Sequence, residues 1–251
     1  LQDESYLNEL IGTYWFITEE VKNPNIYYSL EGYLLPDTYR FTNEDVALKD
    51  LFKKMLDAMN EKITPYQSQI EASGYTFHQI LTIASMAELE ASTTSDRGMV
   101  ARVFYNRLEQ NMTLGSDVTT YYGAKIDMGE RDLYMSEIME ANAYNTRSAS
   151  SAGNLPVGPI CNPGIDTIVA SIDPEENNYY YFVADKNKKV YFNETSADHD
   201  ATIAELQEQG KNPFEITKFN RTNTAGEIKA NYDQFEQKDV TVAGRIIAKR
   251  I

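Results

Sequence analysis

Residues 80–91 constrain the fold of this 251-residue chain more than any other stretch. They read ILTIASMAELEA, with eight apolar residues, two small hydroxyl residues and two glutamates, Glu88 and Glu90. A segment this apolar predicts a buried helix, because an exposed helix would carry polar residues along one face.

The two glutamates at the end of this helix have two interpretations. A carboxyl group in an apolar setting has a raised pKa, so it can hold a proton near neutral pH and donate it. Successive helical residues turn by about 100°, so Glu88 and Glu90 point about 200° apart and only one can face a given cleft. Alternatively, both end a core helix and bind arginines or backbone N–H groups. This segment alone leaves both interpretations open.

Composition limits the classes of partner. The chain is 42% apolar and 12% aromatic, which is enough for a core in one large domain or two ordinary ones. Its net charge of −15 argues against nucleic acid or an anionic membrane surface as the main partner. The sequence contains no apolar run of 18 residues, so it predicts no transmembrane helix.

Cysteine and histidine are scarce. Cys161 is the one cysteine, so no internal disulfide or thiolate zinc cluster is expected, and we interpret it as a buried structural thiol. His78 and His199 are the two histidines, which disfavours a metal site and a Ser-His-Asp triad. No dinucleotide or phosphate-loop pattern occurs. The expectation is that the protein uses no metal and no cofactor.

The remaining periodicity predicts an α+β fold: a helix-rich main domain with a small antiparallel sheet, plus a short helix and strand tail. We expect a polar loop over residues 115–123 and a rigid loop over 155–164. Strands are expected over residues 179–184 and 190–193, and helices over 1–25, 43–64 with Asn43 as the cap, 80–91, from 94, 165–172 and from 196.

Eight short motifs occur in order along the chain. They are EGxxxPDTY (31–39), IASxxExE (83–90), VFxNRL (103–108), LxxDxTxxYG (114–123), YNT (144–146), LPxGP (155–159), NPG (162–164) and YFVAD (181–185). Together they resemble the YceG-like (MltG) family of endolytic murein transglycosylases, over about residues 25–205. Older nomenclature describes this family as aminodeoxychorismate lyase-like.

The resemblance implies a bacterial enzyme at the extracytoplasmic face of the cell membrane, whose N-terminal anchor and LysM-like module are absent from this chain. It implies non-hydrolytic cleavage of the MurNAc-β-1,4-GlcNAc bond in peptidoglycan glycan strands, leaving 1,6-anhydro-MurNAc ends. One carboxyl group acts first as an acid and then as a base, unlike the two carboxylates of most glycosidases. By analogy with the family's Glu-x-Glu element, Glu90 is assigned this role and Glu88 is the alternative.

The matching motifs supply the substrate-binding candidates, each of which also has a purely structural interpretation such as holding a loop or capping a turn. Cell-wall synthesis proteins at the membrane are considered as additional partners. The candidates are Glu31, Asp117, Thr119, Tyr144, Asn145, Thr146 and Asn162.

The C-terminal tail has a different resemblance. Residues 203–229 are similar to the N-terminal segment of a bacterial lysyl-tRNA synthetase, and residues 240–250 to the first strand of its anticodon-binding barrel. One strand cannot close a five-stranded barrel, so aminoacylation is not expected. We divide the chain into a catalytic domain over residues 1–206 and a tail over 207–251, which we expect to be dispensable for cleavage. A coincidental helix-plus-strand tail is the alternative.

Two other functions remain open for the main domain. A non-catalytic peptidoglycan-binding scaffold of cell-wall synthesis could retain both glutamates. An aminodeoxychorismate lyase-like enzyme would need a basic pocket or a cofactor lysine, and the sequence shows neither.

Overall fold

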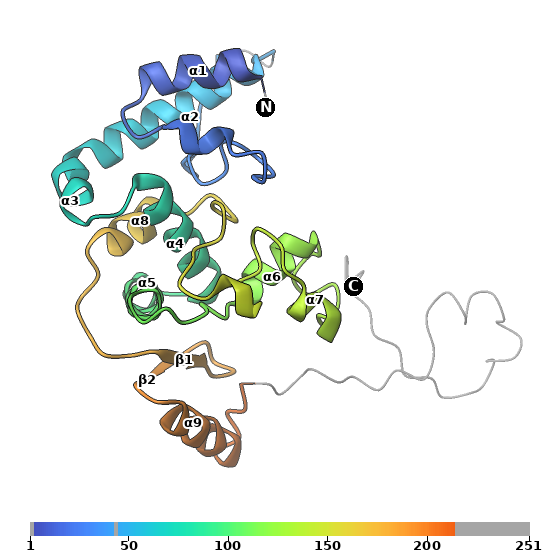
Figure 1. Cartoon of the computed structure of the whole chain (residues 1–251). Helices are drawn as coiled ribbons and strands as arrows, with labels where there is room; N and C mark the ends of the chain where they lie inside the picture. Colours follow the sequence, from blue (N-terminus) through green and yellow to red (C-terminus); the bar gives the residue numbers. More distant parts are fainter. Residues whose placement is uncertain (1–2, 43–44, 214–251) are drawn as a thin grey trace, which may run out of the picture. The chain divides into compact units, whose positions relative to one another are not determined.

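A computed structural model describes residues 3–42 and 45–213, and the synthetase-like segment from residue 214 onward lies outside the described residues. The described part is helix-rich with one two-stranded antiparallel sheet, which confirms the α+β class (Figure 1). In chain order its elements are α1 (Glu4–Thr13), η1 (Glu19–Lys22), α2 (Leu48–Ile63), η2 (Thr64–Tyr66), α3 (Gln67–Ala72), α4 (Phe77–Glu90), α5 (Thr94–Glu109), α6 (Asp117–Ala124), α7 (Met135–Met139), η3 (Ala149–Ser151), α8 (Ile165–Ile172), β1 (Tyr181–Ala184), β2 (Val190–Asn193) and α9 (Ser196–Glu208).

Two predicted helices have different bounds in the structure. The N-terminal helix ends at Thr13, because Tyr14 turns to an extended conformation with φ −113° and ψ 121°. Helix α2 begins at Leu48, with Ala47 at the N-cap position, while the expected cap Asn43 lies outside the described residues.

The prediction of a polar loop over residues 115–123 is wrong. Helix α6 begins at Asp117, whose carboxylate in the first turn interacts favourably with the helix dipole. Threonine and tyrosine have modest intrinsic helix propensity, which hid this helix in the sequence. Its N-cap position is occupied by Ser116.

Helix α4 is the central element of the fold, and it packs against both α5 and α8 (Figure 1). Every side chain from Phe77 to Ala87 except the partly exposed Gln79 is buried, as the apolar sequence predicts. A capping box starts the helix: Gln79 N donates to Thr76 Oγ1 at 3.2 Å and Thr76 N donates to Gln79 Oε1 at 2.8 Å. Its last turn carries the two glutamates.

Side chains of α4 belong to two hydrophobic cores. Ile80, Leu81 and Ala84 belong to a core with the buried side chains of α1 and α2. Ile83 and Met86 belong to a second core with α5, the loop around Tyr144 and the sheet. Since both cores use this helix, its position is fixed from both sides.

The hairpin and α9 form a small layer beside α5. Strands β1 and β2 pair with Phe182 opposite Phe192, and α9 packs against both strands. The Phe182 ring lies edge-on to that of Phe104 on α5, with centroids 6.0 Å apart. The Asp185 carboxylate accepts hydrogen bonds from Asn187 N at 2.8 Å and Lys189 N at 3.0 Å, which fixes the turn between the strands.

A buried histidine joins α4 to two loops. The distance between His78 Nδ1 and the Tyr33 hydroxyl is 2.9 Å, and that between His78 Nε2 and the Val157 carbonyl oxygen is 3.0 Å. Since a carbonyl can only accept, Nε2 carries the proton and Nδ1 accepts from Tyr33. This histidine therefore has a structural role.

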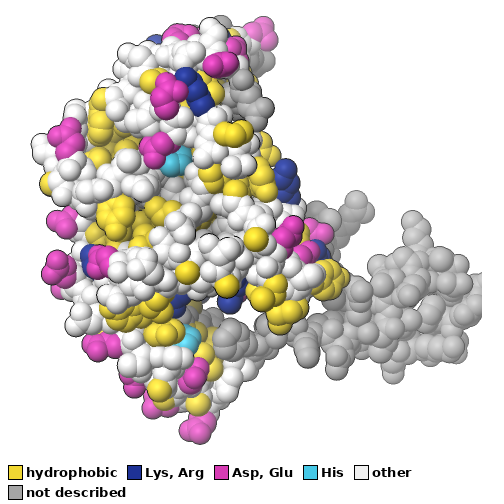
Figure 2. All heavy atoms as spheres, in the orientation of Figure 1, with side chains coloured by type: hydrophobic (Ala, Val, Ile, Leu, Met, Phe, Trp, Pro, Cys, Tyr) yellow, Lys and Arg dark blue, Asp and Glu magenta, His cyan; other side chains and the backbone are white. Residues whose placement is uncertain are grey.

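The surface is predominantly acidic, in line with 38 acidic against 23 basic residues in the chain. Figure 2 shows acidic side chains along much of the visible face, with fewer lysines and arginines between them. In the described ranges, no helix combines the length and the apolar character that crossing a bilayer requires.

Two glycines with similar backbone angles allow a matched test of loop packing. Gly32 has φ +86°, and a Cβ added there would lie 2.5 Å from Pro159 Cγ, whereas Gly74 has φ +78° and open space around it. We expect Gly74→Ala to lower the free energy of unfolding by about 1–2 kcal/mol, since alanine is strained at positive φ. Gly32→Ala should lose about 1–3 kcal/mol more, from the clash.

Urea unfolding of both variants measures this difference. An equal loss of stability in the two would show that the loop around Pro159 yields freely, contrary to the packing described here.

Candidate active site

Glu90 and Ser116 form the centre of the candidate site. Ser116 Oγ donates a hydrogen bond to Glu90 Oε1 at 2.5 Å. Ser116 is buried, whereas the Glu90 side chain is partly exposed at the end of α4. One carboxylate oxygen is therefore held by the protein while the group keeps access to solvent. Asp117 follows Ser116 in the chain and interacts electrostatically with Glu90, and Thr146 binds the backbone of Ser116.

The surroundings of Glu90 raise its pKa above the usual value for a glutamate. Burial is the main cause, and the charge of Asp117 acts in the same direction. The Ser116 hydrogen bond and the positive charges of Arg147 and Arg107 oppose the shift without cancelling it. The apolar helix that the sequence predicts thus has the expected effect on this carboxyl group.

Glu88 points the other way and is fully engaged. Its Oε1 forms an ion pair with Arg97 Nη2 at 2.8 Å. Its Oε2 accepts hydrogen bonds from Gly164 N at 3.2 Å and from the Thr167 hydroxyl. These partners lie on α5 and at the start of α8, so Glu88 ties the end of α4 to both helices. The geometry favours Glu90 over Glu88 as the group available to a ligand.

Two threonines hold Ser116 in place. Thr146 Oγ1 accepts a hydrogen bond from Ser116 N at 3.1 Å and lies 2.8 Å from Thr119 Oγ1. Thr119 Oγ1 also lies 2.7 Å from the Ser116 carbonyl oxygen, to which it donates. Both threonines are buried. These sequence-predicted residues therefore come together around the donor to Glu90, with their hydroxyls bonded inside the protein.

Charged residues surround this frame. Asp117 is exposed and forms an ion pair with Arg147. Arg107 donates from Nε to the Tyr180 carbonyl at 2.6 Å and from Nη1 to the Leu114 carbonyl at 2.7 Å. Arg107 thereby connects the start of the hairpin to the segment that leads into Ser116.

Glu31 lies in a separate cluster of tyrosines. Its carboxylate accepts a hydrogen bond from the Tyr122 hydroxyl, and burial raises the pKa of Glu31 although this bond lowers it. The Tyr122 ring lies 4.7 Å from that of Tyr144, centroid to centroid, and Tyr27 lies 4.8 Å from Tyr144. The fold therefore provides a second partly buried carboxyl group, at the far end of α6 from Ser116.

The two predicted asparagines hold backbone segments. Asn145 Nδ2 donates to three carbonyls at the end of α7, the shortest at 2.6 Å to Glu140, and its Oδ1 accepts from Thr120 Oγ1 at 2.8 Å. Asn162 Oδ1 accepts from Gly32 N at 2.7 Å. Tyr144 is buried, with its hydroxyl accepting from Tyr27 N at 3.1 Å.

Sequence reasoning did not single out Ser116, Tyr122, Arg107 or Arg147. Ser116 and Tyr122 lie inside the matched 114–123 segment, and Arg107 inside the 103–108 segment, so these motifs were the available signal. Their partners are distant in sequence, which only the folded chain reveals.

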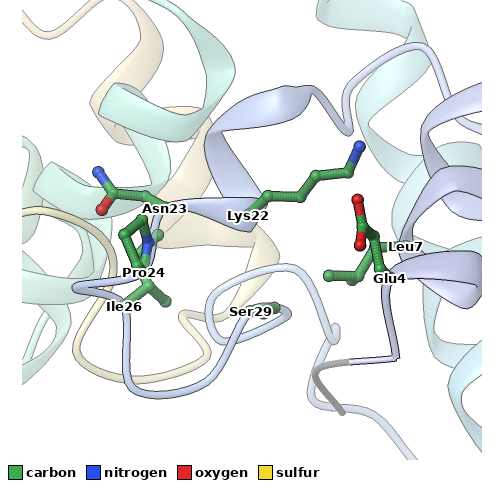
Figure 3. Close-up of a pocket in the computed structure, with 7 residues that line it drawn as sticks. All are labelled: Glu4, Leu7, Lys22, Asn23, Pro24, Ile26 and Ser29. Atoms are coloured by element: carbon green, nitrogen blue, oxygen red, sulfur yellow. The ribbon is translucent and has the colours of Figure 1, made fainter.

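A cavity of about 350 Å³ lies between α1, η1 and the loop that follows η1 (Figure 3). Figure 3 shows Lys22 and Glu4 extending toward one another across it. The Lys22 ammonium is bound by Asn8 Oδ1 at 2.6 Å and Glu19 Oε2 at 2.7 Å. The charge of Lys22 is thus paired with groups of the same fold.

Among residues 3–42 and 45–213, no three His, Cys, Asp or Glu side chains converge in a way that could hold a metal ion.

The chain is similar to a known protein family, to characterised proteins and to a solved structure. The model of the YceG-like family matches residues 4–205. The endolytic murein transglycosylase of Bacillus subtilis is 36% identical over 202 residues, which cover 80% of this chain and 54% of that protein. The crystal structure of a yceG-like protein from Listeria monocytogenes superposes with a TM-score of 0.72 at 33% identity, covering 80% of this chain and 64% of that one.

The second resemblance is also found. A lysine–tRNA ligase of Clostridium tetani is 45% identical over 65 residues, which are 26% of this chain and 13% of the ligase. Both resemblances drawn from the motifs are therefore confirmed. This chain spans about half the length of the Bacillus relative.

The raised pKa of Glu90 predicts a pH-dependent cost in stability. Because the folded pKa exceeds the unfolded value of about 4.3, the group destabilises the fold as pH rises above that value. Glu90→Gln removes this cost and keeps an acceptor for Ser116. Its melting temperature should exceed that of the parent by a few degrees at pH 7.5, and this gain should shrink toward pH 4.

Thermal unfolding across this pH range, with the exposed Glu61→Gln as the control, measures the effect. A gain in melting temperature that does not change with pH would contradict the assignment.

Proposed function

Because this chain belongs to the YceG-like family, we propose that it is a lytic transglycosylase domain acting on peptidoglycan glycan strands. It cleaves the MurNAc-β-1,4-GlcNAc bond and leaves a 1,6-anhydro-MurNAc end. The observation that carries the proposal is the carboxyl group of Glu90, with its raised pKa, one oxygen bound by Ser116 and partial access to solvent. The name of the Bacillus relative, endolytic murein transglycosylase, supports it.

The proposed reaction uses one carboxyl group twice. The raised pKa increases the share of Glu90 carboxyl groups that carry a proton, and this proton is donated to the glycosidic oxygen as the bond to MurNAc C1 breaks. The carboxylate then removes the proton from the MurNAc C6 hydroxyl, whose oxygen bonds to C1 and closes the anhydro ring. Glu90 ends protonated, as it began, and no water is consumed.

Ser116 serves this cycle by its position. Its hydroxyl donates to Glu90 Oε1, which stabilises the carboxylate formed after the first proton transfer. Oε2 is then the oxygen left to exchange the proton with the sugar. Glu88 has both oxygens bound by other groups, so we propose that it positions the end of α4.

The predicted substrate-binding residues fall into two groups by their exposure to solvent. We propose that Asp117 and Glu31, which are exposed and partly exposed, contact the sugar, together with the partly exposed Asn162. The buried residues Thr119, Tyr144, Asn145 and Thr146 are proposed to position the site instead.

The proposed substrate determines the location. Peptidoglycan lies outside the cytoplasmic membrane, so the domain would act on that side. A membrane anchor and cell-wall synthesis proteins as partners stay predictions from the family resemblance.

Paired variants test the role of Glu90. Glu90→Gln should lower kcat on purified glycan strands by at least about a hundredfold, because glutamine cannot shuttle a proton. Glu88→Gln should lower stability by about 1 kcal/mol, since its ion pair is partly exposed, and retain most of the activity. Mass spectrometry of the products should find anhydro-MurNAc ends.

Three results would contradict this assignment. Near-normal turnover by Glu90→Gln with an inactive Glu88→Gln would exchange the two roles. Reducing MurNAc ends would indicate a hydrolase. Strand binding without any cleavage by the parent protein would favour a non-catalytic scaffold.

Deletion of the synthetase-like segment tests the domain proposal. Helix α9 continues to Glu208 with Leu206 buried, so we place the cut after Pro213 rather than after residue 206. Removal of residues 214–251 should leave turnover unchanged. It should lower the melting temperature by no more than about 4 °C, the shift expected for a loss of about 1 kcal/mol in a domain of this size. A larger loss would make this segment part of the catalytic domain.

A further inference from the structure

A cavity of about 530 Å³ opens between the end of α5 and the hairpin. It is lined by Tyr180 and Tyr181, by Met112, and by the polar residues Gln110, Glu194, Thr195 and Ser196. The volume is within the range typical of small-ligand sites. This cavity is separate from the frame around Ser116.

The cavity presents unused hydrogen-bonding groups. Within the described residues, the side chains of Gln110, Glu194 and Ser196 form no hydrogen bond or ion pair, and all three are exposed. Tyrosine adds a flat apolar face with a hydroxyl at its edge. Flat rings beside an amide, a carboxylate and a hydroxyl suit a sugar, which has apolar ring faces and many hydroxyl groups.

The tyrosines are held rigidly. Tyr180 N donates to the Asn193 carbonyl at 3.0 Å, and the Tyr180 carbonyl accepts from Arg107 Nε at 2.6 Å. The Tyr181 ring has two close neighbours, with the Arg107 guanidinium 5.2 Å and the His199 ring 5.6 Å from its centroid. A preorganised surface of this kind loses little conformational entropy when it binds a ligand.

Arg107 connects this cavity to the candidate active site. Besides Tyr180 and Tyr181, it contacts the Leu114 carbonyl, two residues before Ser116, and it interacts electrostatically with Glu90. Arg107 therefore contacts both the segment that leads into Ser116 and two residues that line the cavity, so the two places share one positioning residue.

We propose that this cavity, lined by Tyr180, Tyr181, Gln110 and Glu194, binds sugar units of the glycan strand that are remote from the bond being cleaved. This inference rests on the proposed function. It predicts that the domain binds long strands more tightly than short ones, and that this preference depends on the hairpin.

The test measures binding separately from cleavage. The full chain carrying Glu90→Gln is titrated with peptide-free glycan strands fractionated by length. The titration is repeated with a variant that carries Tyr180→Ala and Glu194→Gln in addition to Glu90→Gln. Tyr180→Ala retains both backbone hydrogen bonds, so the hairpin should fold, and circular dichroism checks this. The matched control is Tyr134→Ala, which removes an exposed tyrosine that does not line the cavity.

The expected result is a Kd about tenfold higher for long strands and nearly unchanged for tetrasaccharides, with no change in the control. In the otherwise native chain, the same cavity substitutions should raise KM on long strands and leave kcat unchanged. Equal Kd values with and without the cavity substitutions, on every strand length, would overturn the proposal. Weakening seen only with peptide-bearing strands would overturn it too, by assigning the cavity to the stem peptide.

The failure of the proposed function has a different signature. If the parent protein binds strands and never cleaves them, the transglycosylase assignment fails, while a length-dependent loss of binding on substitution would still support the cavity as a glycan site.

Discussion

The burial of α4 in two hydrophobic cores is the constraint on which the rest of the described structure depends. One core lies with α1 and α2, and the other with α5, the loop around Tyr144 and the sheet. Helix α4 is buried from Phe77 to Ala87 except at Gln79, and its charged groups, Glu88 and Glu90, lie at its end. The position of Glu88 and Glu90 is therefore fixed by packing that lies well away from either carboxylate.

The two glutamates show how neighbours decide the chemistry of identical side chains. Glu88 meets a guanidinium, a backbone N–H and a hydroxyl, which together satisfy both of its oxygens. Glu90 meets a single neutral donor, Ser116, in a setting whose burial raises its pKa. The first arrangement stabilises the helix ends, whereas the second costs stability at neutral pH and suits the proton donor that we propose. Natural active sites commonly carry such a cost.

The support for Glu90 comes from three segments that are distant in sequence. Ser116 lies 26 residues from Glu90, and Thr146 lies 30 residues from Ser116. Helix α6 begins directly after Ser116, so a shift of this helix would also move the donor to Glu90. Arg107 extends the same frame toward the hairpin, where the tyrosine-lined cavity opens.

The sequence by itself determined the buried helix with its two terminal carboxylates, the hairpin, the α8 helix over Ile165–Ile172 and the family, because apolar periodicity and ordered motifs are local properties of the chain. It also placed Glu90, Asp117, Thr119 and Thr146 in one candidate site. Only the tertiary structure decided that residues 117–124 are helical, that Ser116 is the donor to Glu90, and that Glu88 is engaged by Arg97. These outcomes depend on contacts between segments far apart in the chain, whose energies outweigh local propensity and are not encoded in any single stretch.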